Sequence, residues 1–166
     1  MQSLFAELAT TLRQEIDQYR RLIAVVRKER GRIVRGEFAG LAELVHRKET
    51  ITRDLAQLGA SRLSILERLA RECGEEGSRM TLARVVSMAP GEIGEALQVL
   101  LVEFRGAVGL LMAANDVNRT LLDRSLDFVH GSLALFRTVA TSGPTYNSGG
   151  RCEGDARPLA AVNQTA

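Results

Sequence analysis

The amino-acid sequence predicts an all-α protein: an elongated, antiparallel, left-handed helical bundle of three long helices and one short helix, with a disordered C-terminal tail. Apolar residues recur every three or four positions along most of the 166 residues, which is the period of one face of an α-helix. Hydrophobic residues make up 45% of the chain but aromatic residues only 4%, with no Trp. A core of Leu, Ile, Val and Ala, with only three prolines, suits helix packing better than a β-sandwich.

The first helix is expected from residue 3 to about residue 35. Its apolar positions are separated by three or four residues, and no Pro interrupts them. They are Leu4, Leu8, Leu12, Ile16, Tyr19, Ile23 and Val26. Because Tyr19 belongs to this apolar stripe, we expect its ring to pack in the core with the hydroxyl near water.

A second long helix is expected after a short break between Gly31 and Gly36, restarting at about Glu37 and ending near Cys73. Its stripe contains Leu41, Leu44, Lys48, Ile51, Leu55, Leu58, Ile65, Leu66 and Leu69. So short a break favours an antiparallel hairpin, and the near-heptad spacing favours a left-handed crossing of about 20°. Lys48 lies in the seam, where we expect its stem to pack and its ammonium to reach a carboxylate at the rim and fix the register.

A short third helix, capped by Thr81 and ended near Pro90, precedes a last helix from about Gly91 to Phe136. Between residues 97 and 112 apolar side chains surround most of this helix, so it needs more than one apolar neighbour. Glu95, Glu103 and Arg105 interrupt the run before the roughly 20 apolar residues of a membrane span. We therefore expect protein helices as its neighbours and no membrane insertion.

The distal part of this helix is amphipathic. Spacing residues 100° apart places on one side Asn118, Leu121, Leu122, Ser125, Phe128, Val129, Ser132 and Phe136. Arg119, Asp123 and Asp127 lie opposite. Beyond residue 140 the sequence loses its period, so the predicted organisation is a helical domain over residues 1–140 and a flexible polar tail over residues 141–166.

Composition and motifs argue against several function classes. A net charge of +2 is too balanced for a general nucleic-acid binder, and the basic run from Arg20 to Arg35 is better explained as a solvated helix face than as a phosphate site. Glu43-x-x-His46 and Asp127-x-x-His130 resemble di-metal ligand pairs, but they point away from the predicted seams. We therefore expect no metal, no cofactor, no catalytic residue and no enzyme activity.

Cellular location follows from two negative signals. Cys73 and Cys152 have neither disulfide-framework nor metal spacing, which favours free thiols in a reducing compartment. The N-terminal residues contain no basic region followed by an apolar core, so no secretory signal is visible. The expected location is the cytoplasm.

Two groups of residues between about residues 4 and 149 resemble those of a known family. The weaker group is in the first half of the chain and consists of Glu29, Gly36, Leu41, Leu44, Lys48, Ile51, Leu55, Leu58 and Arg62. The more specific group is Asn118-Arg119-x-Leu121-Leu122-x-x-Ser125-Leu126-x-Phe128-Val129, followed by Thr145-Tyr146-x-x-Gly149. Both groups are similar to those of the FlgN-type flagellar export chaperones. The Pro often found within that family's ending is absent, and a further tail extends to Ala166.

The resemblance implies a cytoplasmic chaperone that binds the C-terminal helical segments of hook-associated (hook-filament junction) proteins. It would prevent their premature assembly and deliver them to the flagellar type III export gate and its ATPase complex. The expected cargo-binding residues are Asn118, Leu121, Leu122, Ser125, Leu126, Phe128 and Val129. Tyr146 is a candidate docking residue, toward cargo or the gate.

The residues alone leave other interpretations open. Each residue of the distal face could instead belong to the intramolecular core. The same surplus of apolar surface is also compatible with a homo-oligomeric coiled-coil structural or adaptor protein. A stable dimer that buried Leu121 to Val129 could not offer that face to cargo.

Overall fold

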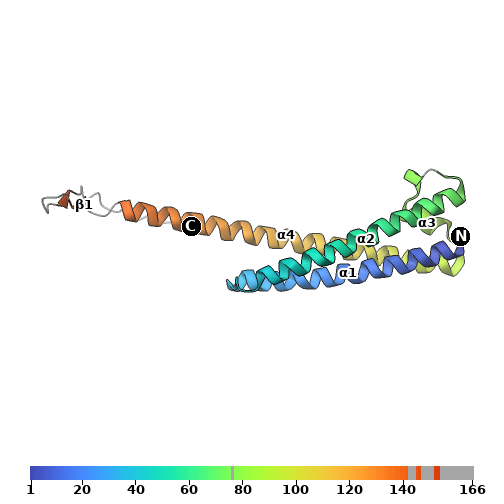
Figure 1. Cartoon of the computed structure of the whole chain (residues 1–166), viewed down its shortest axis with the longest axis horizontal. Coiled ribbons are helices and arrows are strands. Elements are labelled where there is room, and N and C mark those ends of the chain that lie inside the picture. The colour runs from blue at the N-terminus through green and yellow to red at the C-terminus, as the bar shows by residue number, and fades with distance from the viewer. Residues whose placement is uncertain (76, 142–144, 147–151, 154–166) are drawn as a thin grey trace, which may run out of the picture. The chain divides into compact units, whose positions relative to one another are not determined.

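The computed structural model describes residues 1–75, 77–141, 145–146 and 152–153. Its elements are α1 (Gln2–Arg35), α2 (Leu41–Cys73), the 3-10 helix η1 (Gly77–Arg79), α3 (Leu82–Met88), α4 (Gly91–Thr141), β1 (Thr145–Tyr146) and β2 (Cys152–Glu153), in that order (Figure 1). The predicted all-α bundle of three long helices and one short helix is confirmed over these residues. The left-handed crossing stays a prediction.

Helices α1 and α2 form the predicted antiparallel hairpin, joined by residues 36–40 (Figure 1). Gly36 ends α1 in the left-handed region at φ 67°, and the following backbone amide, that of Glu37, donates to the Arg32 carbonyl at 2.9 Å. Gly40 also has a positive φ, 78°, immediately before α2. Glycine adopts these angles without the steric cost of a Cβ, so the chain reverses within five residues. As a result α2 begins at Leu41, later than the expected Glu37.

The main core lies at the end of the hairpin away from this turn. It is built from residues of both hairpin helices together with Met80, Val85 and the beginning of α4. Its most completely buried members include Leu4, Leu8, Leu12, Leu69 and Leu97. The apolar stripes predicted for α1 and the end of α2 therefore face one another and α4.

The start of α3 follows its sequence signal. Thr81 is the N-cap, and its Oγ1 accepts a hydrogen bond from the Arg84 backbone amide at 3.2 Å. Ala89 leaves the helix in an extended conformation before Pro90, as the residue before a proline prefers. The last long helix then begins at Gly91, as predicted.

The chain divides into two units, residues Met1–Leu122 and Asp123–Ala166. The first contains the hairpin, α3 and the first part of α4, in which α4 runs in the same direction as α1 (Figure 1). The second contains the rest of α4, which extends to Thr141, and a β1–β2 pair with Thr145 opposite Glu153 and Tyr146 opposite Cys152. The sequence did not predict these strands. The remainder of the predicted tail lies outside the described residues.

Candidate partner-binding surface

A first cluster of polar and aromatic side chains connects the three long helices within the bundle. Arg62 of α2 donates from Nε to Glu15 Oε2 of α1 at 2.9 Å, and Glu15 is only 1% exposed. The Arg62 guanidinium also lies 5.4 Å from the ring centroid of Phe104 of α4, within cation–π range. Tyr19 packs edge-on against Phe104 with a centroid separation of 5.7 Å, which confirms its predicted place in the apolar stripe.

A second cluster repeats this arrangement further along the bundle. The Lys48 ammonium of α2 donates to both carboxylate oxygens of Glu29 of α1, at 3.1 and 2.9 Å. From α4, Asn118 Nδ2 donates to Glu29 Oε2 at 2.9 Å and to the Val26 carbonyl at 3.0 Å. The ion pair predicted for Lys48 is confirmed, with a carboxylate that is buried rather than at the rim.

The two clusters are two heptads apart on every helix. Glu15 and Glu29, Arg62 and Lys48, and Phe104 and Asn118 are each separated by 14 residues. A shift of α1 against α2 by one turn would leave a buried carboxylate without its cation, and a shift of α4 would break the hydrogen bonds of Asn118 to Glu29 and Val26. The clusters therefore fix the register of α4 against the hairpin. They are structural and connect the three helices at the level of Asn118.

Asn118 differs from the other predicted cargo-binding residues because it is 4% exposed. Its amide nitrogen is fully used by α1, and its Oδ1 has no hydrogen-bond partner among the described residues. The reverse amide orientation would place that oxygen against the Glu29 carboxylate. The hydrogen-bonding groups of Asn118 thus point into the bundle.

The other predicted residues are less buried. Leu121 is half-buried, whereas Leu122, Ser125, Leu126, Phe128 and Val129 are exposed, Phe128 to 76%. Three further exposed apolar residues of the same segment were not among the predicted cargo-binding residues: Phe136, which the sequence analysis placed on the amphipathic face, and Leu133 and Leu135, which it omitted. Their signal was the heptad, since Leu133, Leu135 and Phe136 follow Leu126, Phe128 and Val129 by seven residues. Tyr146 lies in β1.

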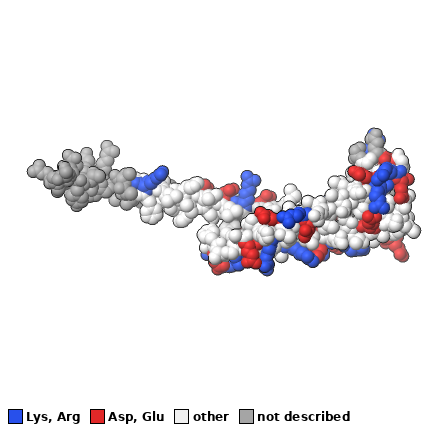
Figure 2. Space-filling view, viewed as in Figure 1, with Lys and Arg blue, Asp and Glu red and all other residues white. Residues whose placement is uncertain are grey.

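We call the seven exposed apolar residues of this segment the distal face. It consists of Leu122, Leu126, Phe128, Val129, Leu133, Leu135 and Phe136. Side chains other than Lys, Arg, Asp and Glu cover most of the visible surface of this segment (Figure 2). A run of exposed large apolar side chains of this kind marks an interaction surface more often than a solvated one.

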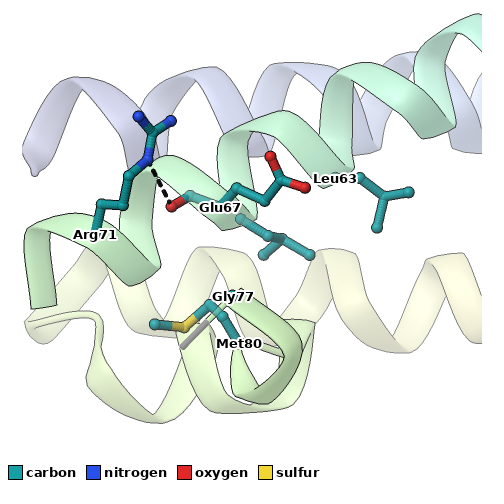
Figure 3. Close-up of a pocket in the computed structure, with 6 residues that line it drawn as sticks. Leu63, Glu67, Arg71, Gly77 and Met80 are labelled. Atoms are coloured by element: carbon teal, nitrogen blue, oxygen red, sulfur yellow. Dashed lines mark hydrogen bonds between the residues drawn. The ribbon is translucent and has the colours of Figure 1, made fainter. Parts of the chain in front are cut away.

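Other hollows of the described structure offer less. The one drawn in Figure 3 lies between α2 and the η1 region and is lined by Leu63, Leu66, Glu67, Arg71, Gly77 and Met80. Arg71 donates from Nε to the Glu67 main-chain oxygen at 3.4 Å, a local helix contact. The six described residues that line this hollow include no nucleophile with a base partner.

The residues of the two candidate metal-ligand pairs, Glu43 with His46 and Asp127 with His130, are exposed on α2 and α4. Glu43 accepts a hydrogen bond from Arg47 at 2.7 Å, and His46 is exposed beside Glu49. His130 is exposed on α4. Among the described residues, no three His, Cys, Asp or Glu side chains come together as metal ligands could.

The apolar composition of α4 corrects one prediction, the one about a membrane span. The charges at Glu95, Glu103 and Arg105 were expected to exclude a span, yet between Gly91 and Thr138 the helix contains a stretch long and apolar enough to cross a membrane. A core helix of a soluble protein has the same property, so this is weak evidence for a span. Leu97, Leu100 and Leu101 are in fact buried within the bundle.

Comparison with known proteins places the chain in a family. Searches of curated proteins and of solved structures each found no match. A model of the FlgN protein family matches residues 1–154, which include the bundle, both polar clusters and the distal face. The chain therefore belongs to the FlgN family of flagellar export chaperones.

Proposed function

We propose that this protein is a cytoplasmic chaperone of flagellar type III export that binds the C-terminal helical segments of hook-filament junction proteins on the distal face of α4. Binding would cover the apolar surface that these segments use for assembly, and the complex would then be delivered to the export gate and its ATPase complex. The observation that carries the proposal is the exposure of seven large apolar side chains on one segment of α4.

The chemistry of the distal face supports a helical partner. An amphipathic helix recognises such a surface by inserting apolar side chains spaced by three, four and seven residues. Phe128 and Phe136 supply the largest anchors, and both are more than 70% exposed before binding. Asn118 sets the register of α4 from within the bundle, while the exposed residues beyond it provide the contact. Tyr146 is proposed as a separate docking residue for cargo or the gate.

Calorimetric titration with a C-terminal helical peptide of a hook-filament junction protein tests the proposal. We expect one-to-one binding with a negative heat-capacity change, because apolar surface is buried. Replacing Phe128 with Ala should weaken binding by roughly 2 to 4 kcal/mol if this side chain is a hot spot. The free energy of unfolding of the Phe128→Ala variant should be unchanged, since the Phe128 ring is exposed.

A double variant on the opposite side of α4, Asp123→Ala with Asp127→Ala, is the matched control and should bind as the wild type does. Binding that survived Phe128→Ala would move the cargo site elsewhere on the chain. A folded wild-type protein that bound no junction-protein segment would count against the chaperone proposal.

The same exposed face also supports a second candidate, a homo-oligomer in which two copies bury their distal faces together. The molecular mass in solution, measured over a hundredfold dilution, separates the two. A monomer at all concentrations supports the chaperone. A dimer that persisted on dilution and dissociated in the Phe128→Ala variant would support the structural or adaptor alternative.

A further inference from the structure

We infer that the distal face of α4 binds two helices of one partner chain, packed side by side, rather than a single helix. This inference rests on the proposed function for the identity of the partner. It concerns the form of the bound segment, which we infer to be a pair of helices. This pair would pack against the distal part of α4 as α1 and α2 pack against its first part.

The width of the distal face is the first reason. At 100° per residue, the arc from Leu135 through Phe136 and Val129 to Leu126 covers about 180° of the helix circumference. One packed neighbour covers a stripe of roughly 100°. A single bound helix that covered the 80° from Phe136 to Leu126 would therefore leave Phe128 and Leu135 in contact with water.

The face has two flanks on either side of Val129 and Phe136. Phe128 and Leu135, seven residues apart, form one flank, and Leu126 and Leu133, also seven residues apart, form the other. All four side chains are more than half exposed. Each flank is thus a heptad-spaced pair able to accept its own helix.

The first part of α4 shows what such flanks do when they are covered. On one side, Ala114 and Val117 share a hollow with Val26 of α1. On the other side, Leu101 and Arg105 share a hollow with Leu66 of α2. Within the bundle, α4 therefore packs against two helices, one on each side of its inward face.

The heptad carries these two sides into the distal segment. Phe128 follows Ala114 by two heptads, so it occupies the position that faces α1. Leu122 follows Leu101 by three heptads, so it occupies a position that faces α2, whereas Leu126 and Leu133 follow Met112 by two and three heptads, and Met112 is 63% exposed. The sequence pattern of the hairpin interface thus continues into the distal segment at Phe128 and Leu122, which are exposed there, and the flank of Leu126 and Leu133 makes the apolar surface wider than the one the hairpin covers.

The expected partner can be described in chemical terms. Residues 123–138 of α4 span about 24 Å at 1.5 Å per residue, which matches two partner helices of roughly four turns each. Asp123 and Asp127 lie on the far side, whereas Arg119 lies 20° beyond Leu126 and Arg124 lies 20° beyond Leu135, so an arginine borders each flank. The pair should be amphipathic, with its shared apolar edge turned to α4.

The test compares two probes on the full-length protein by calorimetry. One probe is the isolated C-terminal helical peptide of a junction protein, and the other is the intact monomeric junction protein. We expect the intact protein to bind at least roughly tenfold more tightly. Two flank variants, Phe128→Ala with Leu135→Ala and Leu126→Ala with Leu133→Ala, should each weaken intact-protein binding by roughly tenfold or more, while only the first of them weakens binding of the peptide.

Three outcomes would overturn the inference. Equal affinities for the two probes, with one flank variant unaffected toward both, would show a single bound helix and leave the proposed function standing. If each chain bound two peptides, one on each flank, the distal face would bind helices from two partner chains rather than a helical pair from one. No binding of either probe by folded wild-type protein would overturn the proposed function itself, and the Asp123→Ala, Asp127→Ala control should match the wild type throughout.

Discussion

Leu97 and Leu126 belong to the same helix and have the same side chain, yet Leu97 is 0% exposed whereas Leu126 is 56% exposed. The first part of α4, Gly91 to Leu122, is locked to the hairpin by buried leucines and two polar clusters. The described side chains from Asp123 to Thr138 include no residue classed as buried. The apolar pattern is similar in both parts, so what differs is the presence of a neighbour.

The difference teaches that the two parts of α4 use apolar side chains for different purposes. In the first part, Val99, Val102, Leu110 and Met112 are also exposed, but the burial of Leu97, Leu100 and Leu101 contributes to the free energy of folding, at roughly 25 cal/mol per Å² of area removed from water. In the distal part, the same kind of surface remains available to a partner. Substitutions in the two parts should therefore separate stability from binding.

Replacing Leu97 with Ala should have the largest effect on stability. The side chain is fully buried in the main core, so its loss should lower the free energy of unfolding by about 3 kcal/mol through lost transfer energy and a cavity. Leu126→Ala, the matched change on the same helix, should alter it by less than about 0.5 kcal/mol. Urea unfolding followed by circular dichroism measures both. Equal destabilisation by the two variants would contradict the comparison.

Asn118→Ala should have a smaller effect on stability, about 1 kcal/mol. The change removes hydrogen bonds to the Val26 carbonyl and the Glu29 carboxylate, but it also removes a buried oxygen that has no partner among the described residues. Affinity for a junction-protein peptide should stay within about twofold, because the side chain faces the bundle. Urea unfolding and calorimetry on the same variant measure both quantities. A large loss of affinity without loss of stability would show that Asn118 contacts cargo directly.

Much of the fold could be predicted from the sequence because the heptad, Gly36 and Pro90 act locally. The Lys48 ion pair could be predicted as well, since a lysine in a seam must find a carboxylate. The start of α2 could not be placed, because a glycine at residue 40 with a positive φ delays the helix. The β1–β2 pair has only two residues per strand, too few for a period to be visible.

For the candidate surface, the sequence pattern identified an apolar helix face but not which part of that face other helices bury. Asn118 and Phe128 belong to one amphipathic face in the sequence, and only tertiary structure shows that α1 covers the first and leaves the second exposed. The pairing of Asn118 with Glu29, 89 positions away, has no local signal. The extension of the face to Leu133 and Leu135 could have been read from the heptad alone.

The pH dependence that Glu15 gives to the stability of the bundle is the smallest effect we expect. It compares the effect of burial with that of charge in the first polar cluster. Burial raises the pKa of the Glu15 carboxyl above its ordinary value, and the Arg62 guanidinium offsets only part of this. The folded protein therefore holds this proton more tightly than the unfolded chain does. Stability contributed by the group is full below the unfolded pKa of about 4.5 and is lost as pH rises through the folded pKa.

Glu15→Gln removes this titration while keeping the shape of the side chain. Unfolding free energies of the two proteins, measured between pH 7.5 and 4.5, should show the wild type gaining stability relative to the variant as the pH falls. If the wild type instead lost stability relative to Glu15→Gln on acidification, the pair with Arg62 would outweigh burial, and the first polar cluster would stabilise the bundle mainly through charge.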